Sequence, residues 1–230
     1  FPTIAEKFIR TGLGPLQVYP NNDLRPETAI NIEAGLKQGV QLGGLQGFLD
    51  VAAFLQEYDD FVEFTFGQWG ASTEALAGNG FRSLNTGRSR VSGWEVSWMG
   101  RAKWGESTID MLAGYTYTNP VSLTPDYLYS VVTNANGDTV GGASYNITSR
   151  DTTGSVLKYR SQNLVRLDAE WRKGDWFVGL SARYQSALRN IDQAWLTFEE
   201  LGVVDWGLQT WLDNNPTLPW IWDFRAGYNV

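Results

Sequence analysis

Adjacent carboxylates are the residues of this 230-residue chain that could most simply perform chemistry. The pairs Asp59-Asp60 and Glu199-Glu200 have the groups of a general acid and base, or of a cation site. Both pairs fall in predicted loops, where neighbouring carboxylates usually serve solvation. The chain contains no histidine and no cysteine, which removes the usual base of a nucleophilic serine and the commonest transition-metal ligands. We therefore predict that the protein is not an enzyme and has no catalytic residue, metal site or cofactor.

Aromatic residues in long polar segments are better candidates for binding. Rigid rings among Asn, Thr, Gly and acidic residues suit ligand capture and contact with another protein alike. The same rings could instead form small cores within their own loops, and the sequence does not decide between the two. The residues predicted to contact a ligand are Tyr127, Tyr129, Trp195, Trp206 and Trp211.

Charged residues recur at alternate positions of several other segments. A period of two places such residues on one face of a β-strand. Both signs occur on neighbouring strands, so we expect partial pairing across the strands, with contact to a further domain as the alternative. The residues predicted to share this face, which would line the lumen of a wide barrel, are Glu33, Asp50, Glu95, Arg166, Asp168, Arg183, Asp223 and Arg225.

The alternation predicts an all-β fold of seven strands. Apolar side chains occupy the opposite face of each strand, as in Ile30, Ile32, Ala34 and Leu36. No apolar run approaches the ~20 residues that a membrane helix needs. The net charge of −7 argues against a nucleic-acid partner. The predicted strands cover residues 29–37, 45–58, 89–99, 108–118, 159–171, 176–186 and 220–230.

The connections alternate between short and long. Predicted turns at 38–44, 101–107 and 172–175 alternate with predicted long loops at 59–88, 119–158 and 187–219, and residues 1–26 are predicted to form a further long loop on the same side. Short periplasmic turns and long extracellular loops are typical of outer-membrane barrels. Aromatic residues at both strand ends predict two membrane-interface girdles, with a soluble antiparallel sheet as the alternative. Trp98, Trp104, Trp171 and Trp176 are expected near the short turns, and Tyr58, Tyr115, Tyr117, Tyr159, Tyr184 and Trp222 near the long loops.

Four stretches in order resemble the barrels of TonB-dependent outer-membrane receptors. The first is the turn Asn22-Asp23-Leu24-Arg25-Pro26-Glu27 with the strand after it, although Asp23 stands where the family often has Pro. The others are Phe1-Pro2-Thr3-Ile4-Ala5-Glu6-Lys7-Phe8, the segment 85–95 (NTGRSRVSGWE), and Tyr159-Arg160-Ser161 leading into residues 163–170. Together they extend over most of the chain.

This resemblance implies a transmembrane antiparallel up-and-down β-barrel of 22 strands with an N-terminal plug domain. Residues 1–230 would be one partial barrel domain containing strands fourteen to twenty, within a longer polypeptide that holds the plug and the last strands. Seven strands with two unpaired edges could not stand alone in lipid. The implied partners are outer-membrane lipid, the protein's own plug, TonB through a plug segment, and a surface lipoprotein or other outer-membrane subunits.

The function implied by the resemblance is active uptake across the bacterial outer membrane. A scarce extracellular ligand, such as a siderophore, corrinoid, glycan or peptide, would enter with energy from TonB. The alternatives are a structural or scaffolding barrel subunit of a larger outer-membrane assembly, and a passive porin.

Overall fold

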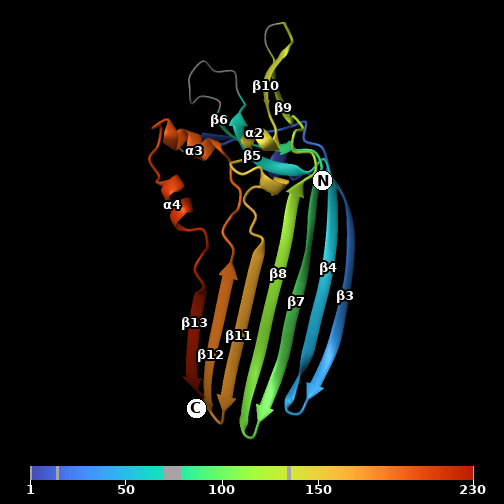
Figure 1. Cartoon of the computed structure of the whole chain (residues 1–230), viewed down its shortest axis with the longest axis vertical. Helices are drawn as coiled ribbons and strands as arrows, with labels where there is room; N and C mark the ends of the chain where they lie inside the picture. The colour runs from blue at the N-terminus through green and yellow to red at the C-terminus, as the bar shows by residue number, and fades with distance from the viewer. Residues whose placement is uncertain (1, 14–15, 70–78, 134–135, 230) are drawn as a thin grey trace.

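The main feature of the molecule is a seven-stranded antiparallel sheet (Figure 1). A computed structural model describes residues 2–13, 16–69, 79–133 and 136–229. The sheet has the order β13-β12-β11-β8-β7-β4-β3, so each strand pairs with the strands that precede and follow it in this sheet. Its strands are β3 (Thr28–Leu42), β4 (Leu45–Asp59), β7 (Ser89–Trp104), β8 (Ser107–Ser122), β11 (Asn163–Lys173), β12 (Trp176–Gln185) and β13 (Ile221–Tyr228).

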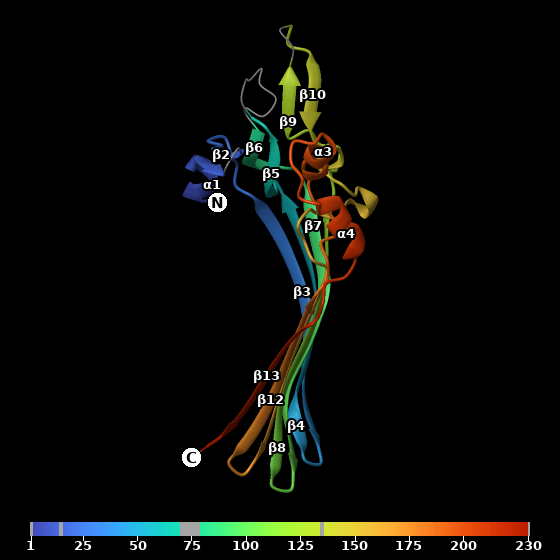
Figure 2. The same ribbon diagram turned by 90° about the vertical axis from the view of Figure 1, so that its left-hand side faces the viewer.

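One face of this sheet is apolar and uncovered in the described part of the chain. Ile30 is 71% exposed and Phe224 is 80% exposed. Figure 2 shows that the sheet is a single twisted layer over most of its length. An apolar face of this extent is what a sheet in contact with lipid presents. The described helices include none that is long and apolar enough to cross a membrane.

The short connections are tighter than the sequence predicts. Each is a two-residue hairpin, and the first turn residue is a glycine with positive φ: 57° at Gly43, 60° at Gly105 and 55° at Gly174. A glycine adopts this conformation at little cost. The predicted turns 38–44 and 101–107 are therefore wrong in extent, because most of their residues continue the strand ladders. The third predicted turn, 172–175, is closer, because β11 ends at Lys173.

Two aromatic residues lie elsewhere than the girdle pattern predicts. Tyr58 is on the polar face of β4, where its hydroxyl donates to Gln56 at 2.8 Å. Tyr159 precedes β11, because the strand begins at Asn163 and the backbone at Tyr159 has φ 58°. The aromatic pairs on the apolar face near the long connections include Trp94–Tyr115, Trp94–Tyr117, Tyr184–Trp220 and Trp220–Trp222.

The long connections fold together at one end of the sheet (Figures 1 and 2). We call their described residues, 2–13, 16–27, 60–69, 79–88, 123–133, 136–162 and 186–220, the loop cap. Within it a second sheet has the order β1-β2-β6-β5. The cap contains α1 (Ile4–Phe8), β1 (Thr11–Leu13), β2 (Leu16–Tyr19), β5 (Val62–Gln68), β6 (Asn79–Asn85), β9 (Ser130–Thr133), β10 (Thr139–Ala143), α2 (Tyr145–Thr148), η1 (Thr153–Ser155), α3 (Ala194–Glu200) and α4 (Leu208–Asn214).

Apolar burial is concentrated in the loop cap. Among the described residues, Ala182 of β12 is the one buried hydrophobic side chain outside it. The long connections therefore share a core instead of extending separately into solvent. The buried hydrophobic residues of the cap are Leu24, Phe66, Leu84, Tyr145, Val156, Leu157, Ile191 and Leu196.

Candidate functional site

A cavity of about 670 Å³ lies where the N-terminal segment meets the three long connections of the loop cap. Its lining comes from Glu6 of α1, residues 62–64 of β5, Phe81 and Ser83 of β6, residues 158–160 before β11, and Trp195 of α3. Each of these segments is held by specific contacts, so the cavity depends on the packing of the whole cap.

The turn at residues 21–27 anchors the N-terminal side of the cavity. The Asn21 amide donates to the Ser83 carbonyl at 2.8 Å, and the Asn21 backbone N–H donates to the Lys7 carbonyl at 3.0 Å. Asn85 accepts from the Arg25 N–H at 2.9 Å and donates to the Arg25 carbonyl at 3.0 Å. These bonds fasten α1 and the turn to β6, beside the cavity.

The adjacent carboxylates have separate structural partners. Asp59 pairs with Arg88 at 3.0 Å, and Asp60 pairs with Arg25. The hydrogen bonds and charge of Asp60 raise the pKa of Arg25. Glu199 accepts from the backbone N–H groups of Leu208 and Gln209 at 3.1 and 3.2 Å, which caps the start of α4.

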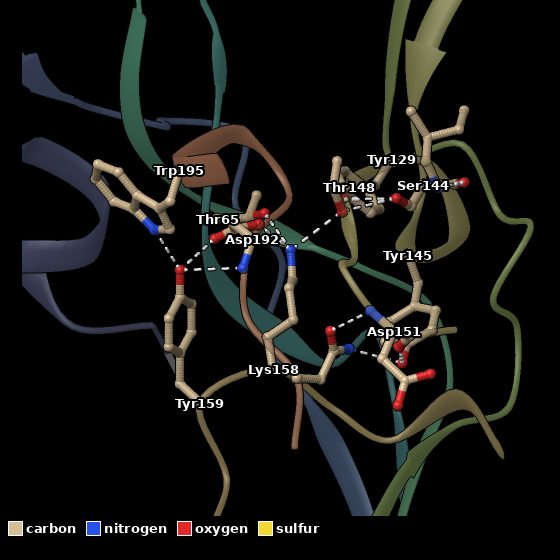
Figure 3. Close-up of polar contacts among 12 residues, drawn as sticks. Thr65, Tyr129, Ser144, Tyr145, Thr148, Asp151, Lys158, Tyr159, Asp192 and Trp195 are labelled. Atoms are coloured by element: carbon tan, nitrogen blue, oxygen red, sulfur yellow. Dashed lines mark hydrogen bonds and ion pairs between the residues drawn. The ribbon is translucent and has the colours of Figure 1, made fainter. Parts of the chain in front are cut away.

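A buried ion pair joins three of the long connections (Figure 3). Lys158 and Asp192 form this pair with side chains 4% and 1% exposed. The Lys158 ammonium also donates to the hydroxyls of Thr65 and Thr148, at 3.1 Å each. Its three donors are therefore all used, as a buried ammonium requires. This group ties β5, α2 and the segment before α3 to a single nitrogen.

Tyr159 extends the same network towards the cavity. Its hydroxyl donates to the second carboxylate oxygen of Asp192 at 2.9 Å and accepts from the Trp195 indole N–H at 2.7 Å. Burial, together with the Asp192 charge, raises the pKa of the Tyr159 phenol. The phenol therefore stays protonated and acts as a fixed link between Asp192 and Trp195.

A second buried cluster supports the cap beside this network. The Tyr145 hydroxyl donates to the Val156 carbonyl at 2.6 Å and accepts from the Asn190 amide at 2.8 Å. The other end of Asn190 accepts from the Asp151 N–H at 3.1 Å. Burial raises the pKa of Tyr145, whereas the hydrogen bond from the Thr153 N–H lowers the pKa of Asp151.

Stacked rings form the apolar wall of the cavity. Phe64 and Phe81 stack at 4.9 Å between ring centroids, and Phe81 lies 5.6 Å from Trp195. Trp206 contacts Trp195, with 5.2 Å between their ring centroids. The structure thus brings two of the aromatic residues predicted to contact a ligand, Trp195 and Trp206, into one cluster.

The other three predicted aromatics lie away from the cavity. Tyr129 is bonded within the cap, to the Ser144 carbonyl and the Thr148 hydroxyl at 3.2 and 2.9 Å. Tyr127 lies beside Gly87, and Trp211 is on α4 with about half of its surface exposed. Ligand contact by any of the five residues stays a prediction.

Glu63, Lys158 and Arg160 also line the cavity, and none of them was expected there from the sequence. Burial raises the pKa of the Glu63 carboxyl, although the positive charges of Lys158 and Arg160 oppose this effect. A signal was present for Glu63, because Val62, Phe64 and Phe66 alternate with Glu63 and Thr65 in the pattern of a strand. Lys158 has no such signal, since its partners come from distant parts of the chain.

The eight charged residues predicted on one face of the sheet do share a face in the strand register. Several of them pair there: Arg225 with Asp168 at 2.9 Å, Arg183 with Asp223 at 3.8 Å, and Asp50 with Lys37 at 4.0 Å. The face therefore neutralises much of its own charge. That it lines a lumen stays a prediction.

An apolar hollow of about 840 Å³ interrupts this charged face near the short turns. Phe48, Met99 and Leu112 lie within it and are about half exposed. Exposed apolar side chains amid charged ones are typical of a surface that another part of a protein covers.

Comparison with known families matches the whole chain to one of them. The family described as "TonB dependent receptor-like, beta-barrel" matches residues 1–230. A search of curated proteins finds no match.

Proposed function

Because the chain belongs to the family of TonB-dependent receptor β-barrels, we propose that it takes part in the uptake of a scarce extracellular ligand. The family indicates a bacterial outer-membrane location, contact with its lipid, and transport coupled to TonB through a plug domain. The ligand-binding role of this particular chain is our inference. A siderophore, a corrinoid, a glycan or a peptide would each suit such uptake.

The observation that carries the proposal is the aromatic-walled cavity of the loop cap. The N-terminal segment and the three long connections converge on it, and a buried ion pair holds the three connections in place. A pre-formed concave site with a few polar groups is the usual form of a small-molecule site. The loop cap would face the outside and the two-residue hairpins the periplasm, as the loop lengths of outer-membrane barrels suggest.

The plug would occupy the charged face of the sheet. The apolar hollow around Phe48, Met99 and Leu112 supports this placement, because it offers a contact that does not depend on charge. The self-paired charges around it would leave few strong attractions to break when the plug moves.

Uptake measurements on cells test the proposal. Cells with the full-length gene are given a labelled ferric siderophore, a cobalamin, an oligosaccharide and a tripeptide, each with and without TonB. We expect one of the four to accumulate only when both the gene and TonB are present. Accumulation that persists without TonB, or no gene-dependent accumulation of any class, would contradict active uptake.

A further inference from the structure

Some of the charged side chains that line the cavity have hydrogen-bond or ion-pair partners, and others do not. Lys158 is paired with Asp192, and the Glu6 carboxylate accepts from the Thr3 N–H at 2.6 Å. Glu63 and Arg160 are different, because within the described residues neither side chain makes a hydrogen bond or an ion pair. The cavity therefore presents one carboxylate and one guanidinium that influence each other through their charges but form no hydrogen bond or ion pair together.

The surroundings of Glu63 favour a bound cation. Glu63 lines the cavity and is partly buried, and loss of water around it raises its pKa although the positive charges of Lys158 and Arg160 oppose this. The neighbouring Lys158 charge is already neutralised by Asp192, whose own charge also disfavours a second carboxylate. An ammonium group of a ligand would supply the missing opposite charge and three donors.

The exposed rings of the aromatic wall favour a ligand that also has an apolar part. Phe64 is 50% exposed and stacks on Phe81 next to Trp195. A ring or branched aliphatic group of the ligand would cover these surfaces, and the nearby cation would interact favourably with the ring faces.

We propose that the cavity binds a short peptide through its amino-terminal residue. The terminal ammonium lies at Glu63, the first apolar side chain packs against Phe64, Phe81 and Trp195, and the peptide carboxylate pairs with Arg160. This inference rests on the proposed function, since it names the class of ligand to be taken up. The cavity volume is in the usual range for a small-molecule site.

Other ligand classes satisfy fewer of these groups. A neutral glycan would stack on the rings but would leave the Glu63 carboxylate without a counter-charge. A ligand with negative charge alone would suit Arg160 but would be repelled by Glu63 and Glu6. A zwitterion with an apolar body would pair with both charged side chains and pack against the aromatic wall of the cavity.

Binding of matched peptides to the purified full-length protein in detergent tests the proposal. The probe is Phe-Gly-Gly, compared by titration calorimetry with its N-acetyl form, its C-terminal amide and Gly-Gly-Gly. We expect acetylation to weaken binding about tenfold or more, as expected for loss of a charge-assisted hydrogen bond. Glu63→Gln should weaken Phe-Gly-Gly similarly and leave the acetylated peptide unaffected, and Arg160→Gln should weaken the free acid but not the amide.

Glu106→Gln, in the hairpin at the opposite end of the sheet, is the matched control and should bind like the unaltered protein. Equal binding of the free and acetylated peptides, or no effect of Glu63→Gln, would overturn the proposal. So would the absence of peptide binding in a protein that still takes up another ligand through TonB. Peptide binding that responds as expected, without TonB-dependent uptake, would instead contradict the transport function alone.

Discussion

At the scale of single residues, the loop cap depends on Lys158 and Asp192. Side chains from segments that are distant in the sequence form hydrogen bonds with this pair. Both side chains of the pair are almost fully buried. A buried ion pair of this kind is costly to break, since the remaining charge has no water to replace its partner.

Lys158→Met should destabilise the cap by about 3–5 kcal/mol, because it leaves the Asp192 carboxylate buried and unpaired. The double variant Lys158→Met/Asp192→Leu should be much less destabilised. Hydrogen exchange of residues 62–66, 145–149 and 190–195 in the full-length protein measures the opening of the cap. If the single and double variants exchange equally fast, the pair does not hold the cap together.

Glu63→Gln should make the cap more stable at neutral pH, because the Glu63 carboxylate is partly buried and forms no ion pair with the described residues, whereas an amide carries no charge to desolvate. The raised pKa means that the folded cap holds the Glu63 proton more tightly than the unfolded chain does. Stability from this group is therefore complete below the ordinary pKa of 4.5 and is lost as the pH rises through the raised value. Urea denaturation monitored by hydrogen exchange should show the gain at neutral pH and little difference in acid. A loss of stability at neutral pH would contradict the burial of a free carboxylate.

The sequence allows the charged face of the sheet to be predicted, but not the buried network. Asp168 and Arg225 follow a period of two, which assigns them to one face without any tertiary information. Lys158 and Tyr159 lie where the sequence suggests the start of a strand, and the left-handed backbone at Tyr159 gives no local signal. Their partners come from other loops, so a single chain segment cannot reveal them.

At the scale of elements, the hairpin between β11 and β12 presents two tryptophans on the apolar face. Trp171 pairs with Val178 across the strands, and Trp176 contacts the Tyr228 ring at 5.0 Å. Trp176 directly follows the two-residue turn, and Trp171 lies two positions further along the ladder, level with Val178. Indole rings with this placement are typical of a membrane interface, where the ring is apolar and the N–H reaches polar groups.

Replacing Trp171 and Trp176 by Ala should lower the stability of the full-length barrel by about 1–3 kcal/mol for each ring removed. Arg at either position should be tolerated, since charge near the interface costs far less than at the membrane centre. Folding into lipid vesicles measures the first effect, and quenching by brominated lipids reports the depth of each ring. If bromines at the bilayer centre quench the rings most strongly, the hairpin does not lie at the membrane interface.

At the scale of the whole molecule, the longest strands exceed the thickness of a membrane. β8 has 16 residues, or roughly 50 Å of strand, and a tilt of about 40° still leaves a height near 40 Å. The apolar outer band of a barrel is only about 25 Å tall. On β7 this band fits the stretch from Trp94 to Trp104, beyond which Arg90 pairs with Glu57 on the same face. We infer that the upper ends of β4, β7 and β8 stand clear of the lipid with the cap.

Thiol labelling tests this orientation, and the native chain has no cysteine to interfere. Thr152→Cys lies in the cap and Glu106→Cys in a hairpin at the other end, and both positions are exposed. An impermeant maleimide added to intact cells should modify Thr152→Cys and spare Glu106→Cys. The reverse labelling pattern would mean that the cap faces the periplasm and the hairpins face the outside.

The height of the sheet falls in a step between β8 and β11. β8 continues from Tyr117 to Ser122 after its pairing with β11 has ended, a difference of about 15–20 Å along the strand. The segment between β12 and β13, with α3 and α4, fills the space above the shorter strands (Figure 1). Its contacts there include the Arg150–Asp213 ion pair at 3.9 Å and the Trp195–Trp206 contact, neither of which is part of a strand ladder. Other contacts fix this segment to the rest of the cap, because Asp192 pairs with Lys158 and forms a β-bridge with Ser149. The lower side of the rim is therefore sealed by tertiary contacts instead of a long strand ladder, and opening it would require breaking a buried ion pair.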